Sequence, residues 1–249
     1  MIKVAAVGDL HFDRRSHNRL AEHLPDLKEK ADILVLAGDL TQTGHPDEMK
    51  ILAEDLSSSP IPVVGVLGNH DHHSNEVESI TQILRSAGVN VLEKSSITLE
   101  IRGIKIGIAG AKGFGGGFIG ACGSEFGEKE MKVFMQHSKK EAREFEEVIK
   151  DLKCDLKIAL LHYSPIMETL VGEKKEIYPF LGSYFLAEAV DYGQADIVFH
   201  GHAHSGVEKG TTPLGIPVRN VAQPVIRQAY NLYSIEKKHD FNIFLNRPN

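Results

Sequence analysis

The stretch IVFHGHAH, residues 197–204, sets three histidines two positions apart directly after an apolar run. Ile197, Val198 and Phe199 have the continuous apolar character of a strand that is covered on both faces. Gly201 follows, and a glycine lets the backbone turn sharply and bring neighbouring side chains to one centre. The stretch therefore predicts a buried strand that delivers histidine side chains at its carboxyl end.

Short apolar runs of the same kind recur along the chain, at residues 2–7, 32–37, 61–67, 155–161 and 195–199. Helical patterns separate the earlier runs, with apolar residues at helical spacing over residues 15–30, 46–57 and 75–87. Strands that alternate with helices indicate an α/β protein whose sheet is largely parallel.

The middle of the chain predicts a hairpin and a long helix. Strand patterns at residues 96–101 and 104–109 flank Arg102 and Gly103, which fits a two-residue turn and brings antiparallel pairing into the fold. The longest helical pattern covers residues 129–152. Its expected buried positions are Val133, Phe134, Phe145, Val148, Ile149 and Leu152.

The last part of the chain predicts three further strands, over residues 217–222, 229–235 and 241–246, with a turn at 236–240. The sequence contains no internal repeat, no low-complexity tract and no linker rich in proline or serine. We therefore expect a single domain over residues 1–249.

The bulk composition is that of an ordinary globular protein. Hydrophobic residues make up 42% and charged residues 25% of the 249 residues, without the bias of a disordered or fibrous chain. The 28 basic and 34 acidic residues give a formal net charge of −6, which disfavours nucleic acid as a partner. The composition indicates no oligomeric state.

Cysteine usage and the lack of long apolar stretches lead us to expect a cytoplasmic protein. Cys122 and Cys154 are too far apart for a thiol redox motif and too few for a disulfide framework, so both are expected to be reduced packing residues. Residues 1–10 lack the charged region and cleavage site of a signal peptide. No apolar stretch approaches the ~20 residues needed to cross a bilayer, so we expect no membrane partner.

Polar residues stand at the ends of five predicted strands. The sequences are GDLH at 8–11, GDLT at 38–41, GNHD at 68–71, LLH at 160–162 and HGHAH at 200–204. Because the carboxyl ends of parallel strands converge on one crevice, these segments are able to deliver their side chains to one place. The side chains are carboxylates, an amide and imidazoles, from Asp9, His11, Asp39, Asn69, His70, Asp71, His162, His202 and His204.

Each of these residues has a simpler explanation on its own. A lone aspartate after a strand commonly caps a helix, and a lone histidine is commonly a hydrogen-bonded core residue. Coincident placements beside glycines or tight turns favour a shared site instead. The absence of thiolates disfavours structural zinc, whereas oxygen and imidazole donors suit manganese, iron, zinc or cobalt in a catalytic site. Such a donor set exceeds one tetrahedral ion and suits two ions about 3.5 to 4 Å apart that share a carboxylate.

A family resemblance rests on five ordered blocks that span residues 4–204. The blocks are similar to those of the calcineurin-like metallophosphoesterases, and they read Asp9-Leu-His11, Gly38-Asp39, Gly68-Asn69-His70-Asp71, His162 and Gly201-His202-Ala203-His204. The resemblance implies an α/β fold with mixed α and β elements, a four-layer αββα sandwich of two mixed β-sheets flanked by helices. GDLTQTGHPDE at 38–48, followed by VLGNHD at 66–71, further resembles the bacterial branch that includes cyclic-nucleotide phosphodiesterases.

The same resemblance implies two divalent metal ions and the residues that bind them. For the first ion it implies Asp9, His11 and His204. For the second ion it implies Asn69, His162 and His202, and Asp39 would bridge the pair. His200, inside the strand end, is expected to be structural. Many relatives have a second histidine where Tyr163 stands here, and this departure bears on which substrates fit.

The implied activity is hydrolysis of a phosphoester at a binuclear metal centre, with a metal-bridging hydroxide as the nucleophile. Two divalent ions outweigh the charges of Asp9 and Asp39, so an acidic chain is able to bind an anionic substrate. His70 resembles the family's catalytic histidine, a proton donor or electrophile. Asp71 is expected to orient His70 by accepting a hydrogen bond from its other ring nitrogen. The expected substrate is a small-molecule phosphoester, with a diester preferred to a monoester.

The alternatives are a phosphomonoesterase or a nuclease of the same family and a noncatalytic metal-binding scaffold. A nuclease would need a basic groove or stacking aromatics, and the net charge of −6 and the lack of tryptophan argue against it. A scaffold that kept only the fold would be expected to lose ligands or the catalytic histidine, whereas this sequence retains them all.

Two loops are longer than simple connections. Residues 112–123 are rich in glycine but open no helix and lack the lysine and hydroxyl pair of a P-loop, which favours a flexible loop over a nucleotide cradle. Residues 163–182 have the length of loops that shape or cover a site. Lys112, Lys174 and Lys175 lie on these loops, and we expect them on the solvated surface rather than against substrate.

Overall fold

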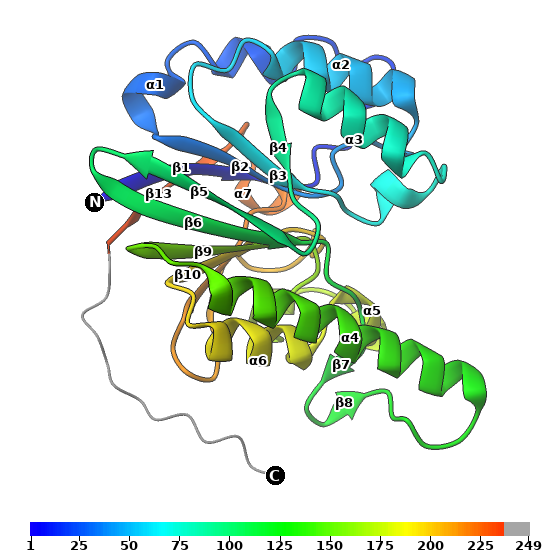
Figure 1. Cartoon of the computed structure of the whole chain (residues 1–249). Helices are drawn as coiled ribbons and strands as arrows, with labels where there is room; N and C mark the ends of the chain where they lie inside the picture. The colour runs from blue at the N-terminus through cyan, green and yellow to red at the C-terminus, as the bar shows by residue number, and fades with distance from the viewer. Residues whose placement is uncertain (237–249) are drawn as a thin grey trace.

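Two β-sheets pack face to face in the computed structural model, which describes residues 1–236, and helices cover both outer faces (Figure 1). This order of layers confirms the four-layer αββα sandwich of two mixed sheets. Side chains of both sheets, among them Val35, Ile108 and Phe199, form the core between the sheets. The expected single domain over residues 1–249 stays a prediction.

The first sheet has the strand order β13-β1-β2-β3-β4, with β1 to β4 parallel and β13 antiparallel to β1. The apolar runs predicted β1, β2 and β3 within two residues of their observed bounds. The sequence pattern misses β4, because Val89 and Val91 are not part of an apolar run long enough to indicate a strand. The bounds are β1 (Ile2–Val7), β2 (Ile33–Ala37), β3 (Val63–Val66), β4 (Val89–Val91) and β13 (Asn231–Ile235).

The second sheet has the strand order β11-β12-β10-β9-β6-β5. Its four central strands run parallel, and β11 and β5 add antiparallel edges. The pattern misses β11, which is short and mostly polar. The bounds are β5 (Ser95–Ile101), β6 (Ile104–Ala111), β9 (Leu156–Leu161), β10 (Ile197–His200), β11 (Lys209–Thr211) and β12 (Pro217–Asn220).

The predicted hairpin is confirmed as β5 and β6, joined by Arg102 and Gly103. Both turn residues have positive φ, 53° and 76°. A two-residue turn of this handedness matches the right-handed twist of the strands that it joins. The hairpin therefore forms one of the two antiparallel edges of the second sheet.

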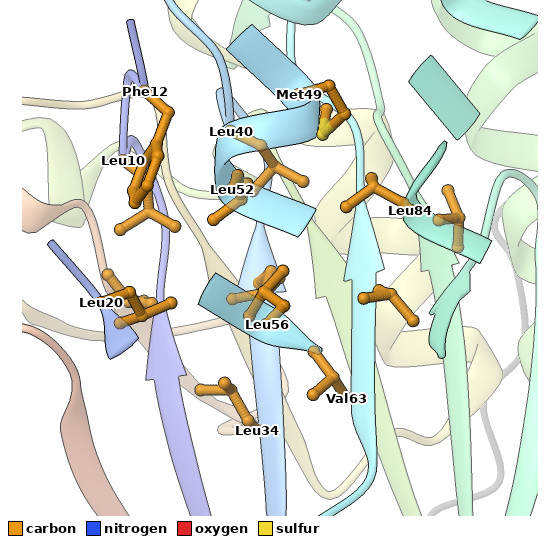
Figure 2. Close-up of a cluster of buried hydrophobic side chains, with 14 of the residues drawn as sticks. Leu10, Phe12, Leu20, Leu34, Leu40, Met49, Leu52, Leu56, Val63 and Leu84 are labelled. Carbon is orange, nitrogen blue, oxygen red and sulfur yellow. The ribbon is translucent and has the colours of Figure 1, made fainter. Parts of the chain in front are cut away.

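Amphipathic helices bury their apolar faces on the outer sides of the sheets. α2 (Pro46–Leu56) and α3 (Val77–Ser86) confirm the predicted helices and cover the first sheet, whereas α4 (Lys129–Asp151) and α6 (Tyr184–Gly193) cover the second (Figure 1). Figure 2 shows the first of these interfaces, where leucines of α2 and α3 meet side chains of β2 and β3. The labelled residues there include Leu34, Leu52, Leu56, Val63 and Leu84.

The predicted helix over residues 15–30 is wrong. Only a 3-10 turn, η1 (Ala21–His23), and the short α1 (Leu27–Lys30) are helical. Pro25 lacks the N–H that a continuous helix needs at that position. The buried Asp55 carboxylate of α2 also accepts hydrogen bonds from the backbone N–H groups of Asn18, Leu20 and Ala21, which holds this segment in an irregular path.

The predicted buried face of α4 is correct in the second half of the helix and wrong at Val133. Phe145 and Ile149 are buried, but Val133 is 55% exposed. The buried positions near the start of α4 are Met135 and Ser138, so the face that meets the sheet is rotated away from Val133. The first turns of α4 also extend past the end of the second sheet (Figure 1).

The remaining elements are short and lie mostly in the loops. β12 and β13 confirm two of the three C-terminal strands, while the predicted strand at 241–246 and residues 237–240 of the predicted turn lie outside the described residues. None of the helices within residues 1–236 is long and apolar enough to cross a membrane. The short elements are η2 (His70–His72), β7 (Gly117–Phe118), β8 (Ala121–Cys122), η3 (Glu168–Leu170), η4 (Lys175–Ile177), α5 (Tyr178–Leu181) and α7 (Gln223–Ile226).

Candidate metal centre

The carboxyl ends of five strands, three from the first sheet and two from the second, meet at one edge of the sandwich. β1 leads to Asp9, β2 to Asp39 and β3 to Asn69, while β9 leads to His162 and β10 to His202. Each of these residues lies within three positions of the end of its strand, so the strand fixes where its side chain starts. Residues far apart in the sequence therefore come together at this edge.

A first group consists of Asp9, His11, Asp39 and His204. One possible ligand atom from each lies within 4.8 Å of the others. His204 Nε2 lies 2.8 Å from Asp9 Oδ1 and 3.3 Å from His11 Nε2. Two imidazole nitrogens and two carboxylates thus point toward one small volume, which is the arrangement that a bound cation requires.

A second group consists of Asp39, His162 and His202, whose possible ligand atoms also lie within 4.8 Å of one another. Asn69 joins this group, because its Oδ1 lies 2.9 Å from His162 Nε2. His162 Nε2 is also 3.3 Å from Asp39 Oδ1. Asp39 belongs to both groups, so its carboxylate stands between them. The structure therefore brings together all seven residues for which the sequence predicts metal binding.

Four residues of the site have the left-handed backbone conformation that favours glycine. Their φ angles are 56° at Asp9, 46° at His11, 49° at Asp39 and 72° at His202. Such a conformation costs about 1–3 kcal/mol for each non-glycine residue and persists only where its surroundings enforce it. Here the surroundings do so through hydrogen bonds, since the backbone N–H of His202 donates to both carboxylate oxygens of Asp9.

Two glycines leave the space that the carboxylates occupy. A Cβ atom at Gly68 would collide with the carboxylate and backbone nitrogen of Asp39, and one at Gly201 would collide with the carboxylate of Asp9. Neither glycine has a positive φ, so glycine is required here because another segment approaches closely and not because the backbone adopts an unusual turn. The glycines predicted to permit tight convergence do so at these two positions.

Backbone carbonyls set the orientation of two imidazoles. His162 Nδ1 lies 2.9 Å from the carbonyl oxygen of Ala37, and His202 Nε2 lies 3.2 Å from that of Phe180. A carbonyl oxygen only accepts, so the nitrogen that faces it carries the proton. This leaves His162 Nε2 and His202 Nδ1 with lone pairs for a metal, the kind of support that metal-binding histidines receive in proteins. Sequence reasoning missed Phe180, which acts through its main chain.

Burial favours the neutral imidazole at His11 and His202, whereas Asp9 favours the protonated form of His204. Burial lowers the pKa of His11, and burial together with the neighbouring His162 lowers the pKa of His202 to about 4. Burial raises the pKa of Asp9, but the hydrogen bond from His204 and the nearby imidazoles outweigh it, so the net shift is downward. That hydrogen bond to Asp9 raises the pKa of His204.

The donor set fits divalent metal ions. Oxygen and imidazole nitrogen donors without thiolate suit manganese, iron, zinc or cobalt. Within residues 1–236, the only buried side-chain nitrogen or oxygen without a hydrogen-bond partner is Nδ1 of His11, a member of the first group. The His11 atom that faces the other donors is Nε2, 3.3 Å from His204 Nε2 and 3.9 Å from Asp39 Oδ2, and a bound cation would accept the lone pairs that converge there.

His70 lies beside both groups. Its Nε2 is 3.9 Å from Asp39 Oδ2, and its ring centroid is 4.5 Å from that of His11. Its Nδ1 lies 2.8 Å from the carbonyl oxygen of Gln42. The ring is therefore held at one nitrogen and presents the other to the site. Sequence reasoning missed Gln42, because a main-chain carbonyl leaves no side-chain signal.

The predicted hydrogen bond between Asp71 and His70 is wrong. The Asp71 carboxylate is completely buried and accepts from the backbone N–H groups of Leu40, Thr41 and Gly68 and from the Thr41 hydroxyl, at 2.6 to 3.1 Å. The Gln42 carbonyl occupies the place at His70 Nδ1 that the prediction gave to Asp71. Burial and the nearby Asp39 raise the pKa of Asp71 to about 6. Asp71 instead ties the loop after β2 to the loop after β3.

His200 lies outside both groups, as predicted. It is fully buried, with Nδ1 2.7 Å from the Gly201 carbonyl oxygen and Nε2 2.9 Å from the Thr169 hydroxyl. Burial lowers its pKa to about 4, so the ring is neutral. Thr169 belongs to the loop at 163–182, so this loop packs beneath the histidine-bearing turn.

The two long loops pack against each other beside the second group. The backbone N–H groups of Gly116 and Gly117 donate to the carbonyl oxygens of Pro179 and Gly182, at 2.7 and 2.9 Å. The glycine-rich segment 112–123 also contains the β7–β8 pairing and is not simply a flexible loop. Lys174 and Lys175 are exposed as predicted, whereas Lys112 is half-buried, which corrects its expected place on the solvated surface.

The mixed αββα sandwich carries two groups of oxygen and imidazole donors at the carboxyl ends of its strands, which makes it an α/β protein with a candidate metal centre. The chain belongs to the calcineurin-like phosphoesterase family, because the model of that family matches residues 2–206. This range includes every residue of both groups.

Two curated relatives are glycerophosphodiester phosphodiesterases by name. The GpdQ protein of Enterobacter lignolyticus is 24% identical over 155 residues, which cover 54% of this chain and 56% of that relative. "Probable glycerophosphodiester phosphodiesterase GpdQ" of Arcobacter nitrofigilis is 34% identical over 53 residues, which cover 21% of this chain and 19% of that relative. The chain thus matches a little more than half the length of the first relative and about a fifth of the second.

A solved structure with a similar fold is that of the TT1561 protein of Thermus thermophilus. The two chains are 18% identical and superimpose with a TM-score of 0.52, and the match covers 88% of each. A second crystal structure, 14% identical, covers 94% of this chain with a TM-score of 0.61. At these identities the likeness shows the fold alone.

Proposed function

We propose that the protein hydrolyses phosphoesters with the help of two divalent metal ions, and that it prefers a diester to a monoester. The observation that carries this proposal is the presence of two donor groups that share Asp39. The membership of the calcineurin-like phosphoesterase family and the names of the glycerophosphodiester phosphodiesterase relatives support it. The substrate is a small-molecule phosphoester.

The first ion would be held by Asp9, His11 and His204, and the second by Asn69, His162 and His202. Asp39 would bridge them. When bound, such a pair of ions supplies Lewis acidity for the phosphoryl oxygens and activates water for attack in line with the leaving group. Manganese, iron, zinc and cobalt are the candidate metals, because the donors are carboxylate, amide and imidazole.

His70 would donate a proton to the leaving oxygen of the substrate. The Gln42 carbonyl accepts from Nδ1 of His70 whether the ring is neutral or protonated, so the ring keeps its orientation through the transfer. The other nitrogen, Nε2, faces the site beside Asp39 and is the atom that would give up the proton. A proton donor of this kind removes the need for the leaving group to depart as a free alkoxide.

Asp71 would act as a positioning residue and not as a direct partner of His70. Its carboxylate binds Leu40 and Thr41, which directly follow Asp39, and Gly68, which directly precedes Asn69. The bridging carboxylate and the Asn69–His70 turn are thus fixed relative to each other through one buried group. Such support of metal-binding loops affects both metal affinity and turnover.

The test is hydrolysis of bis-p-nitrophenyl phosphate and of p-nitrophenyl phosphate by the purified protein, with and without added manganese. We expect the diester to be hydrolysed with the higher kcat/KM, and we expect a chelator to abolish the activity. Higher kcat/KM for the monoester would replace the diesterase by a monoesterase. Hydrolysis of neither compound with any of the four candidate metals would contradict the proposal.

A further inference from the structure

Lys112 and Tyr163 lie at the same sheet edge as the candidate metal centre. Lys112 directly follows β6 and Tyr163 follows His162 after β9, and these two strands are parallel neighbours in the second sheet. The backbone N–H groups of His162 and Tyr163 both donate to the carbonyl oxygen of Lys112, at 3.1 and 3.0 Å. Lys112 is therefore fixed beside a residue of the second donor group.

The Lys112 ammonium is half-buried without forming an ion pair within residues 1–236. Its Nζ donates to the carbonyl oxygen of Gly113 at 3.1 Å and lies 5.3 Å from the ring centroid of Phe114 and 5.2 Å from that of Tyr163. Burial lowers the pKa of Lys112. Aromatic faces stabilise a cation without using its N–H groups. An ammonium has three N–H donors, so two remain for a ligand.

The Tyr163 ring is buried against the second donor group, but its hydroxyl has no protein partner in the described part of the chain. The residue is 9% exposed, and its ring centroid lies 4.5 Å from that of His202 and 5.5 Å from that of His162. Nδ1 of His11 is the one completely covered side-chain nitrogen or oxygen without a partner in residues 1–236, so the Tyr163 oxygen, which also lacks a partner there, is not completely covered. A covered ring with an open hydroxyl presents a donor to a ligand.

The glycine-rich segment holds these two residues in place. Gly113 has a φ of 76°, and a Cβ there would lie 3.0 Å from a methyl group of Leu186 and 3.4 Å from Cβ of Tyr163. Gly113 therefore allows the chain to turn closely over Tyr163 directly after Lys112. On the other side of Lys112, the Glu93 carboxylate accepts from its backbone N–H at 3.2 Å. The ammonium thus extends from a backbone that is fixed on both sides.

We propose that Lys112 and Tyr163 determine substrate specificity, by binding an anionic group of the phosphoester other than the phosphoryl group that is hydrolysed. The ammonium supplies the charge and the Tyr163 hydroxyl supplies a second hydrogen-bond donor. The substrates favoured are phosphoesters that carry a further phosphate or carboxylate. This inference rests on the proposed function, because it assigns the second binding position of that site.

The experiment compares two small ligands that differ by one anionic group. Methylphosphonate and phosphonoacetate share a phosphonate, and phosphonoacetate adds a carboxylate. Their dissociation constants are measured by calorimetry on the metal-loaded protein. We expect wild type to bind phosphonoacetate about tenfold or more tightly than methylphosphonate, the effect of one charge-assisted hydrogen bond. Lys112→Met should lose this advantage and bind methylphosphonate within about twofold of wild type.

Matched variants separate charge from folding. Lys105→Met changes the same charge at the exposed, opposite end of β6 and should keep the full advantage. Lys112→Arg keeps the charge and should keep most of the advantage. If Lys112→Met does not fold, Tyr163→Phe carries the test instead. Tyr163→Phe removes only the hydroxyl and should reduce the advantage severalfold, while metal content by mass spectrometry stays unchanged.

Two outcomes would overturn the inference. Equal affinity of wild type for the two ligands would show that no second anion position exists. An undiminished preference for phosphonoacetate in Lys112→Met would show that other groups make it. In both cases, hydrolysis of bis-p-nitrophenyl phosphate by wild type would leave the proposed function standing. A metal-loaded wild type that neither binds methylphosphonate nor hydrolyses the diester would overturn both.

Discussion

The two sheets supply different chemistry to the same site. Loops after β1, β2 and β3 of the first sheet supply both carboxylates and the amide, whereas loops after β9 and β10 of the second sheet supply only imidazoles. The first sheet therefore determines the charge of the site. The second sheet supplies imidazoles, and main-chain carbonyls of Ala37 and Phe180 orient two of them.

A buried polar side chain lies beneath each set of loops. Beneath the first sheet's loops it is a carboxylate, and beneath the second sheet's loops it is an imidazole. Under the first sheet's loops, the Asp71 carboxylate accepts hydrogen bonds from four donors. Under the second sheet's loops, the neutral His200 ring shares hydrogen bonds with Thr169 and Gly201. A buried carboxylate is costly to disturb, while a neutral network loses less when one member is removed. Substitutions in the first sheet's loops should therefore have the larger effects.

The largest effect is expected for Asp39→Asn, which removes the negative charge shared by both donor groups. Loss of metal would remove several kcal/mol of transition-state stabilisation, which corresponds to a fall of about 10³-fold or more in kcat. Metal content and hydrolysis of bis-p-nitrophenyl phosphate measure it. The control is Asp32→Asn, the same change beside the other end of β2, where Asp32 pairs with Arg102. Wild-type activity in Asp39→Asn would contradict the two-metal assignment.

His70→Ala should lower kcat by about 10²–10⁴-fold, because it removes a proton donor. The variant should still bind metal, since His70 belongs to neither donor group. The exposed His73, three residues further along, supplies the control His73→Ala, which should keep wild-type turnover. If His70→Ala lost metal instead, His70 would be a ligand and not the proton donor.

Asp71→Asn should lower activity by about 10- to 100-fold and reduce metal affinity, because it turns one acceptor oxygen into a donor that faces N–H groups. Asp55→Asn makes the same change at a buried carboxylate that also accepts from three backbone N–H groups, but these belong to residues 18, 20 and 21 and not to the loops that carry the donor groups. Thermal unfolding should show a loss of stability in both variants. Only Asp71→Asn should lose turnover, and equal loss in both would make Asp71 a stability residue only.

The smallest effect on activity is expected for Thr169→Val, beneath the second sheet's loops. The change removes the closer hydroxyl partner of His200 Nε2 and leaves the Ser164 hydroxyl at 3.5 Å, and it should lower the free energy of unfolding by about 1–3 kcal/mol. Activity and metal content should stay within about twofold of wild type. Thr98→Val, at an exposed position of β5, should change stability by less than about 0.5 kcal/mol. A large loss of metal in Thr169→Val would remove the contrast between the two sheets.

The family resemblance predicted the layers, and the sequence pattern placed at one edge the nine polar residues that the structure has there. Side-chain type and position after a strand are enough for that, because strand ends converge whatever the loops do. The contacts of Gln42 and Phe180 could not be predicted, since both act through main-chain carbonyls that any residue possesses. The predicted hydrogen bond between Asp71 and His70 is wrong for the same reason. Backbone N–H groups bind the Asp71 carboxylate instead, and they leave no signal in the sequence.

Local errors in the fold also have physical causes. The helix expected over residues 15–30 matches the spacing of Leu20, Leu24 and Leu27, which are all buried. Spacing alone does not distinguish a helix from an irregular segment that packs the same side chains. Pro25 and the hydrogen bonds to the Asp55 carboxylate favour the irregular segment over the helix. The strands β4 and β11 have three residues each, which is too short for an alternation to be visible.

The hydrogen bond between Asp9 and His204 joins residues 195 positions apart in the chain. Contacts of such long range form late during folding, since the intervening polypeptide must already be arranged. No fragment that contains only one sheet possesses a complete pocket for a cation. The refolding chain would then take up metal only after the two sheets have packed against each other. The rate of metal uptake would therefore report the rate of that last folding step.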